Sequence, residues 1–308
     1  MAYKNSRVDK VLTNVSIDYR PTGFIADKIA TPLTVPKRTG FLGSYGDAHL
    51  QLIDSRVFDR GKVKIIPSFE YNISKTYNLI THGIGDYISY EDLREVEQPF
   101  DVEEDTVAGI KSLLTIEKEY LGSSLYRTAA NYSSTNTETL TGTARFNHYS
   151  TSNPVQKVQE AKNKIWEKSG VEATTLIAEL PVIEILRSHT ALASVYGYTG
   201  TKATMTIQQL MSTFGLQEII VAKAQYVNSA GTQGGFWGKD MIICNRMPRA
   251  MRHQKTFSYH MEQEGFQENV YRNRIDNPPG TQEILGVKVY NFNIMDQDAG
   301  YLFKNVID

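Results

Sequence analysis

The sequence predicts an α+β fold in which one long helix, at about residues 101–131, separates an extended N-terminal part from a compact α/β lobe. Apolar residues recur at helical spacing through this stretch, whereas the roughly one hundred residues before it are typical of arm, loop and strand. After it, helices and strands alternate. This order suits a protein that reaches across neighbouring molecules better than it suits an enzyme.

The long helix is marked at its start and along one face. Asp101 and Glu104 have capping-box spacing, and acidic residues fill the first turn, where the helix dipole is positive. The apolar stripe that predicts a buried face consists of Val107, Ile110, Leu114, Leu121 and Leu125. Gly109 and Gly122 each cost the helix about 1 kcal/mol relative to Ala, so we expect a closely passing backbone or a bend at these positions.

The composition is that of a globular protein without a dominant charge. The 308 residues are 41% apolar and include 33 Lys and Arg against 34 Asp and Glu, so no overall field favours nucleic acid or an anionic membrane. Cys244 lies in an apolar run and is expected to be buried in a strand. Because it is the single cysteine of the sequence, a disulfide within the chain is excluded. No segment has the ~20 apolar residues of a membrane span, and the N-terminus lacks the apolar core of a secretion signal.

The N-terminal part predicts an arm and a ribbon. Residues 1–35 carry apolar anchors with little periodicity, so they are expected to lie along another surface, such as a neighbouring subunit. Residues 36–82 predict a two-stranded excursion, which is marginal in water and needs a supporting surface. Four basic residues in it form either a solvated strand face or a contact with a neighbouring subunit: Arg56, Arg60, Lys62 and Lys64.

The second half of the chain predicts the lobe and a strand-rich ending. Residues 135–152, rich in Thr, Ser and Asn, predict a loop or a weak hairpin. The elements predicted for the lobe are helices from Val155, Pro181 and Ile207 and strands at 174–180, 218–227 and 241–245. The remaining residues, 246–308, predict mainly strands.

Tests for chemistry find no site. The glycine-rich run at 230–239 lacks P-loop spacing and joins two strands, so we expect a loop at the edge of the lobe. The six histidines lack a close ligand pair, and no metal, cofactor or catalytic residue is predicted. The acidic residues at 91–105 are explained by helix capping and solvation. The basic cluster at 246–255 lacks interleaved aromatics, which favours a subunit contact or a charged turn over nucleic acid.

The order of these segments resembles a tailed-bacteriophage major capsid protein. The resemblance rests on VDKVLTNVSIDYRPTGFIADKIATPLTVPKRTG near the N-terminus, on THGIGDYISYEDLREVEQPFDVEEDTVAGIKSLLTIEKEYL at the long helix, and on the lobe and strands that follow. It covers nearly the whole chain, although the family has no short diagnostic motif. The domains it implies are an N-terminal arm (1–35), an extended loop or E-loop (36–82), a peripheral domain with a spine helix (83–152), an axial domain (153–245) and return strands of the peripheral domain (246–308).

The resemblance implies a structural role with no enzyme activity. Subunits would assemble into pentamers and hexamers of an icosahedral shell around double-stranded DNA. The loop at 196–202 and the run at 229–238 would face the centre of each capsomer, and Arg56 to Lys64 would contact the adjacent subunit. The side chains expected to contact neighbours at the axis are Tyr196, Tyr198, Phe236 and Trp237.

The resemblance also implies partners and a location in the virion. Because the arm begins at Met1 with no scaffolding segment before it, a separate scaffolding protein is expected, together with a portal. The DNA would be enclosed without sequence-specific binding, no membrane would be involved, and assembly would take place in the host cytoplasm. Encapsulins share the fold and are the nearest alternative; an oligomeric enzyme with an unrecognised carboxylate site is a distant one.

Overall fold

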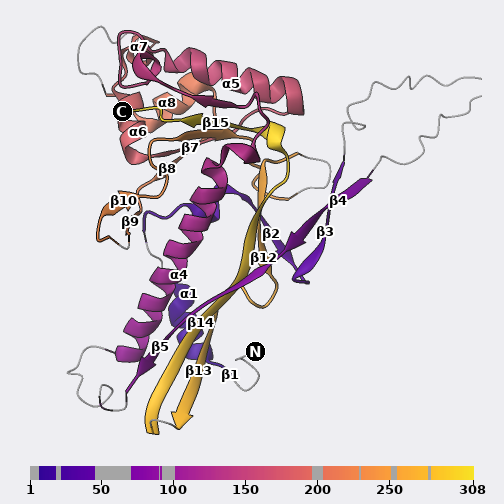
Figure 1. The fold of residues 1–308 in the computed structure, drawn as a ribbon, viewed down its shortest axis with the longest axis vertical. Helices are drawn as coiled ribbons and strands as arrows, with labels where there is room; N and C mark the ends of the chain where they lie inside the picture. The colour runs from indigo at the N-terminus through magenta and orange to yellow at the C-terminus, as the bar shows by residue number, and fades with distance from the viewer. Residues whose placement is uncertain are drawn as a thin grey trace, which may run out of the picture.

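The long helix and two sheets organise the computed structural model (Figure 1), which describes residues 7–18, 22–45, 71–89, 91, 101–195, 204–228, 230–250, 255–276 and 279–308. Helix α4 (Val102–Arg127) extends from the α/β lobe along the long strands of a six-stranded sheet. Its 26 residues span ~39 Å. Asp101 caps its start by accepting hydrogen bonds from the amides of Glu103 and Glu104, as the sequence predicts.

The helix ends earlier than predicted. Thr128 has an extended backbone, with φ −83° and ψ 113°, and a short 3₁₀ turn (Ala129–Asn131) follows it. Tyr132 then stacks on Phe257, with 4.9 Å between ring centroids. The residues after Arg127 are therefore irregular because they turn into the core instead of continuing along the helix axis.

A six-stranded sheet lies beneath α4. Its strands, in the order in which they pair, are β1 (Arg7–Val8), β13 (Asn269–Asp276), β14 (Pro279–Ile294), β12 (Ser258–Gln263) and β2 (Thr31–Val35), with β5 (Ile80–Ile88) also pairing with β14. Ile110 and Leu114 of α4 pack over Gly286 of β14, where a Cβ would lie 2.6 Å from Ile110 Cγ2. The absence of a side chain at Gly286 lets the helix approach the sheet this closely.

The α/β lobe is built on a five-stranded sheet. Its strands pair in the order β6 (Thr137–Thr139), β15 (Gly300–Lys304), β11 (Met241–Cys244), β7 (Thr175–Glu179) and β8 (Glu218–Ala222). The lobe also contains helices α5 (Pro154–Ser169), α6 (Leu180–Arg187), α7 (Thr190–Val195) and α8 (Ile207–Phe214), and the hairpin of β9 (Gln225–Val227) and β10 (Gln233–Gly235). Cys244 is buried, as predicted.

Alternate residues of the central lobe strands enter two separate cores. Met241 and Ile243 join the core beneath helices α5, α6 and α8. Ile242 joins a second core that also contains Tyr126 of α4 and Ile29 of the arm. The opposite face of the lobe sheet is thus buried by the end of the long helix and by the N-terminal arm.

The last strand differs from the prediction. Residues 246–308 are predicted as return strands of the peripheral domain, and β12, β13 and β14 do join the six-stranded sheet, yet β15 pairs with β11 inside the lobe sheet. Strand β6, from the predicted loop at 135–152, pairs in parallel with β15. The reason is burial, because Tyr301, Leu302 and Phe303 have almost no exposed surface and supply both cores.

The ribbon is present. Strands β3 (Thr39–Tyr45) and β4 (Tyr71–Asn78) pair antiparallel with each other and with no other strand of the described residues. Figure 1 shows them to one side of the body. The predicted contact residues Arg56, Arg60, Lys62 and Lys64 lie outside the described residues.

The arm is more ordered than the sequence predicts, and its described parts dock on their own chain. Strand β1 pairs with β13, and helix α1 (Lys10–Asp18) packs on α4 through Leu12. Helix α2 (Ala26–Ile29) leads into β2, which pairs in parallel with β12. The described parts of the arm therefore lie along another surface, as expected, and that surface belongs to their own chain. Helix α1 escaped prediction because its buried side includes the polar Ser16 beside Leu12.

Candidate functional site

Three parts of the chain meet where the arm crosses the long helix. We call this place the arm junction: residues 23–29 of the arm, Lys118, Glu119 and Tyr126 of α4, and Trp237 of the lobe. The Tyr126 hydroxyl donates to the carbonyl of Ile29 at 2.9 Å. The carbonyl of Gly23 accepts from the amides of Lys223 and Ala224 at 3.3 and 3.1 Å. The arm is thus bonded to both the helix and the lobe.

Glu119 is the centre of the arm junction and has no exposed surface. Its Oε2 accepts from the amides of Ile25 and Ala26 at 2.9 and 2.6 Å, and its Oε1 accepts from the Trp237 indole at 2.7 Å. Burial raises the pKa of this carboxyl above its usual value, although the three N–H donors partly offset the effect. One carboxylate oxygen of Glu119 therefore accepts hydrogen bonds from the arm, and the other accepts one from the lobe.

Lys118, the preceding residue of α4, supplies the positive charge of the arm junction. Its buried ammonium pairs with Asp27 of α2 and lies 3.2 Å from Glu262 Oε1 of β12. It also lies 5.1 Å from the centre of the Tyr290 ring. One lysine therefore joins the arm, the long helix and the six-stranded sheet.

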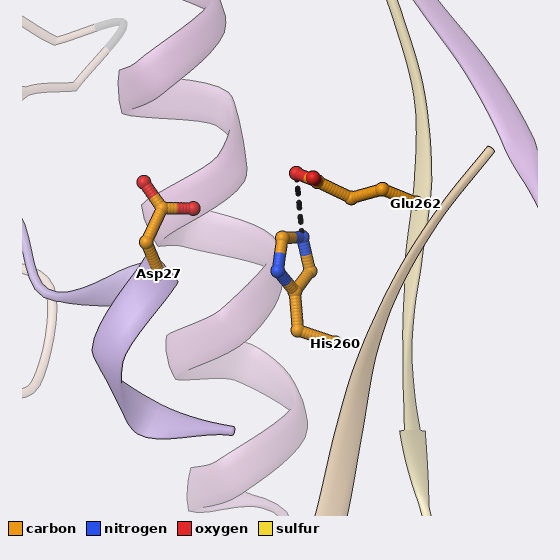
Figure 2. A group of neighbouring side chains, drawn as sticks. All are labelled: Asp27, His260 and Glu262. Carbon is orange, nitrogen blue, oxygen red and sulfur yellow. Dashed lines mark ion pairs between the residues drawn. The ribbon is translucent and has the colours of Figure 1, made fainter. Parts of the chain in front are cut away.

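Asp27, His260 and Glu262 form a group that could hold a metal ion, with ligand atoms within 4.8 Å of one another (Figure 2). His260 Nε2 lies 3.5 Å from Glu262 Oε1 and has no hydrogen-bond partner. Burial lowers the pKa of His260 to about 3, so its ring is neutral at pH 7. However, the Lys118 ammonium already pairs with both carboxylates. The group fits a structural role in docking the arm better than a metal site.

Of the predicted axial contacts, Phe236 and Trp237 lie within the described residues. They are 3% and 1% exposed. The Phe236 ring lies 6.2 Å from that of Phe24 in the arm, and the Trp237 ring lies 6.1 Å from that of Tyr126 in α4. The expected contact with a neighbouring subunit is therefore corrected for these two side chains, which pack inside their own chain. Aromatic side chains are common both in protein cores and at subunit interfaces, so the sequence alone did not distinguish a buried position from a subunit contact.

The other predicted residues and motifs have mixed outcomes. Tyr196 and Tyr198 lie outside the described residues. The glycine-rich run contains β10, which pairs with β9, and leads to β11, so it joins strands, as predicted, and does not open a helix. Among the acidic residues, Glu103 pairs with Arg272 of β13. Arg246 of the basic cluster pairs with Glu218 at 2.9 Å, within its own chain.

The sequence did not single out Lys118 or Glu119. Charged side chains of a helix normally lie on its solvated face. One available signal was the position of Lys118, four residues after Leu114 and so in register with the apolar stripe. Another was Gly122, where a Cβ would lie 3.0 Å from Ile29 Cδ1 of the arm. The closely passing backbone expected at Gly122 is not what lies there, because the nearest atoms belong to the side chains of Ile29 and Phe292. None of the described helices is long and apolar enough to cross a membrane.

Comparison with known proteins reveals similarity along nearly the whole chain. No protein-family model matches. The major capsid protein of Burkholderia phage BcepMu is 22% identical over 305 residues, which cover 97% of this chain and 96% of that protein. The resemblance predicted from the sequence is therefore supported by a capsid protein of nearly the same extent.

The structure is similar to solved structures from phages and encapsulins. A phage-related protein of Bordetella bronchiseptica superposes with a TM-score of 0.77 at 20% identity, over 98% of each chain. An encapsulin from Synechococcus elongatus gives 0.57 at 12% identity, over 95% of this chain and 90% of that one. The capsid of cyanophage P-SCSP1u gives 0.56 at 9% identity, over 91% and 88%. The chain thus has the α+β fold of tailed-phage major capsid proteins, which the encapsulin also has.

Proposed function

We propose that this chain is a phage major capsid protein, whose copies form the pentamers and hexamers of an icosahedral shell around double-stranded DNA. Its likeness to the capsid protein of phage BcepMu over 97% of the chain supports this function. The structural observation that carries it is the β3–β4 ribbon, which pairs only with itself among the described strands. Its base packs through Tyr77 and Leu42 on Met261 and Val289 of the six-stranded sheet. A two-stranded ribbon needs a support along its whole length, which an adjacent copy would supply beyond this base in a shell.

The outer face of the long helix offers a surface for such a contact. Gly109, Leu113 and Tyr120 lie along it, and Leu113 and Tyr120 are 51% and 55% exposed. Among the described residues, nothing outside the adjacent turns of the helix comes within 4 Å of a Cβ at Gly109, so these contacts give no packing reason for a glycine there. A neighbouring copy that approaches this face closely would give one. Arg56, Arg60, Lys62 and Lys64 remain predicted contacts of the ribbon, and Tyr196 and Tyr198 of the axial loop.

The remaining partners follow from this function. A separate scaffolding protein and a portal would take part in assembly in the host cytoplasm, and the finished shell would belong to the virion. The net charge of −1 provides no general attraction for DNA, so the shell would enclose the genome without sequence-specific binding. The proteins that this chain resembles are structural, which supports a role without catalysis.

An encapsulin shell is the second candidate, favoured by the shared fold. It is the weaker one, because the sequence similarity is to a phage capsid protein and the TM-score to the phage-related protein is higher, 0.77 against 0.57. The two functions differ in content. A capsid packages DNA, whereas an encapsulin holds a protein cargo.

Mass measurement of the expressed protein tests the proposal. We would measure it by light scattering, with and without the scaffolding protein encoded beside it, and image the same samples by electron microscopy. Uniform shells, or rings that close when scaffold is added, are expected. A monodisperse monomer or dimer in both samples would contradict a shell of either kind, while particles from infected cells that contain a protein cargo and no DNA would favour the encapsulin.

A further inference from the structure

The arm and the lobe share one buried acceptor. Glu119 gives one oxygen to the amides of Ile25 and Ala26 and the other to the indole of Trp237. Among the described residues, no basic side chain lies within ion-pair distance of it, since Lys118 pairs with Asp27 and Glu262. Three neutral N–H groups therefore provide the hydrogen bonds that stabilise this carboxylate.

A carboxylate in this position is costly to leave half-bonded. A buried charged acceptor that loses a donor is destabilised more than a neutral one. If the arm undocked, Glu119 would lose the two amide donors. If the loop between β10 and β11 (residues 236–240, the Trp237 loop) moved away, Glu119 would lose the indole donor. Undocking of either segment therefore also lowers the stability of the docked position of the other.

We propose that Glu119 couples the docking of the arm to the docking of the Trp237 loop, so that both segments are held or released together. The coupling is a property of the single chain. Its role in a shell rests on the proposed function. There, displacement of the arm by a neighbouring copy would also release the Trp237 loop, so the conformation of this loop would depend on whether the arm is docked. Glu119 is then a positioning residue for both.

Direct contacts between arm and lobe provide a competing explanation. Phe24 packs against Phe236, and the Gly23 carbonyl bonds to the lobe, both without Glu119. A test must therefore separate the shared carboxylate from simple packing. Trp237→Phe does so when it is made both in the native chain and in Glu119→Gln, because the change in packing is common to both and the bond to the carboxylate is present only in the native chain.

Protease sensitivity of the arm is the readout. Lys28 is exposed in α2, so trypsin cleavage after it reports how often the arm opens. Trp237→Phe should raise the cleavage rate roughly tenfold, the effect of losing one hydrogen bond to a charged group. In the Glu119→Gln background the same change should alter the rate less than about twofold, because the amide NH₂ already faces the indole N–H there.

Tyr132→Phe is the matched control. It removes a buried hydrogen bond in the same core, from the Tyr132 hydroxyl to the Tyr126 carbonyl at 2.7 Å, without touching Glu119. The cleavage rate should stay unchanged. Equal acceleration by Trp237→Phe in both backgrounds would show packing alone, and no acceleration in either would show no coupling; both outcomes overturn the proposal.

A second readout follows Trp237 itself. The chain has two tryptophans, and Trp166 is 61% exposed, so Trp166→Phe leaves Trp237 as the sole reporter. Adding Glu119→Gln should make the emission more accessible to acrylamide, and an unchanged signal would contradict the coupling. If Glu119→Gln does not fold, Trp237→Phe against Tyr132→Phe decides. These measurements use unassembled subunits, so their result does not depend on whether the protein forms a shell.

Discussion

Glycines show how single residues set the approach of the long helix to its surroundings. Gly286 lies beneath α4, and Gly122 lies beneath Ile29 of the arm. Gly109, by contrast, has no neighbour within 4 Å of a Cβ in the part of the chain that the structure describes. The same residue type therefore allows close packing at two positions and serves no internal contact at the third.

Alanine at two of these positions should have opposite effects on the unassembled subunit. Gly286→Ala should lower the free energy of unfolding by about 1–3 kcal/mol, because its Cβ would meet Ile110 Cγ2 at 2.6 Å. Gly109→Ala should raise it by about 1 kcal/mol, because a helical glycine is replaced without a clash. Urea unfolding measures both, and a neutral Gly286→Ala would contradict the packing described.

A buried histidine makes stability depend on pH. His189 has no exposed surface; its Nδ1 accepts from the Ala191 amide at 3.2 Å, and its Nε2 bonds with Ser152 Oγ at 3.0 Å. Burial lowers its pKa from 6.5 to about 4. The unfolded chain therefore takes up the proton first as the pH falls, and stability is lost from about pH 6.5 down toward pH 4.

This loss should be measurable by urea unfolding at two pH values. Between pH 7 and pH 5, His189 should account for about 2 kcal/mol of lost stability. His189→Gln, which cannot take up the proton, should remove that part of the pH dependence while retaining a donor and an acceptor. If the variant and the native chain lose the same stability over this range, the assignment to His189 is wrong.

At the scale of elements, the ribbon and the arm differ in what supports them. The ribbon packs on the six-stranded sheet at its base, through Tyr77, but leaves Phe41 69% exposed. The described parts of the arm are held by α4, the lobe and β12. Helical and strand periodicity predicted the ribbon, the long helix and most lobe elements, because each has one regular apolar face. The arm was harder to predict, since its anchors are backbone groups that bond to distant residues such as Glu119.

Phe41→Ser separates folding from assembly. Because the side chain is mostly exposed, the stability of the unassembled subunit should change by less than about 0.5 kcal/mol. Shell formation should fall sharply, since the ribbon loses an apolar contact with its neighbour. Trp166→Ser, at a residue 61% exposed on α5, is the comparison, because no contact with a neighbouring copy is proposed for that helix. Equal shell yields from native chain and Phe41→Ser would contradict a role for this face of the ribbon.

At the scale of the whole molecule, the segment order predicted the capsid fold, and the comparisons confirm it. The order was informative because arm, ribbon, long helix and lobe each have a distinct local pattern. The sequence did not reveal that β15 enters the lobe or that Phe236 and Trp237 are internal. Those features depend on pairing between distant segments, which a local pattern does not specify.

The most direct test of the shell function is a cryo-electron microscopy reconstruction of the particles that this chain forms. We expect a closed icosahedral shell of pentamers and hexamers in which the β3–β4 ribbon of each copy lies on an adjacent copy. A protein that forms no closed particle with or without its scaffold, or a particle in which every ribbon lies away from all neighbouring copies, would contradict the account.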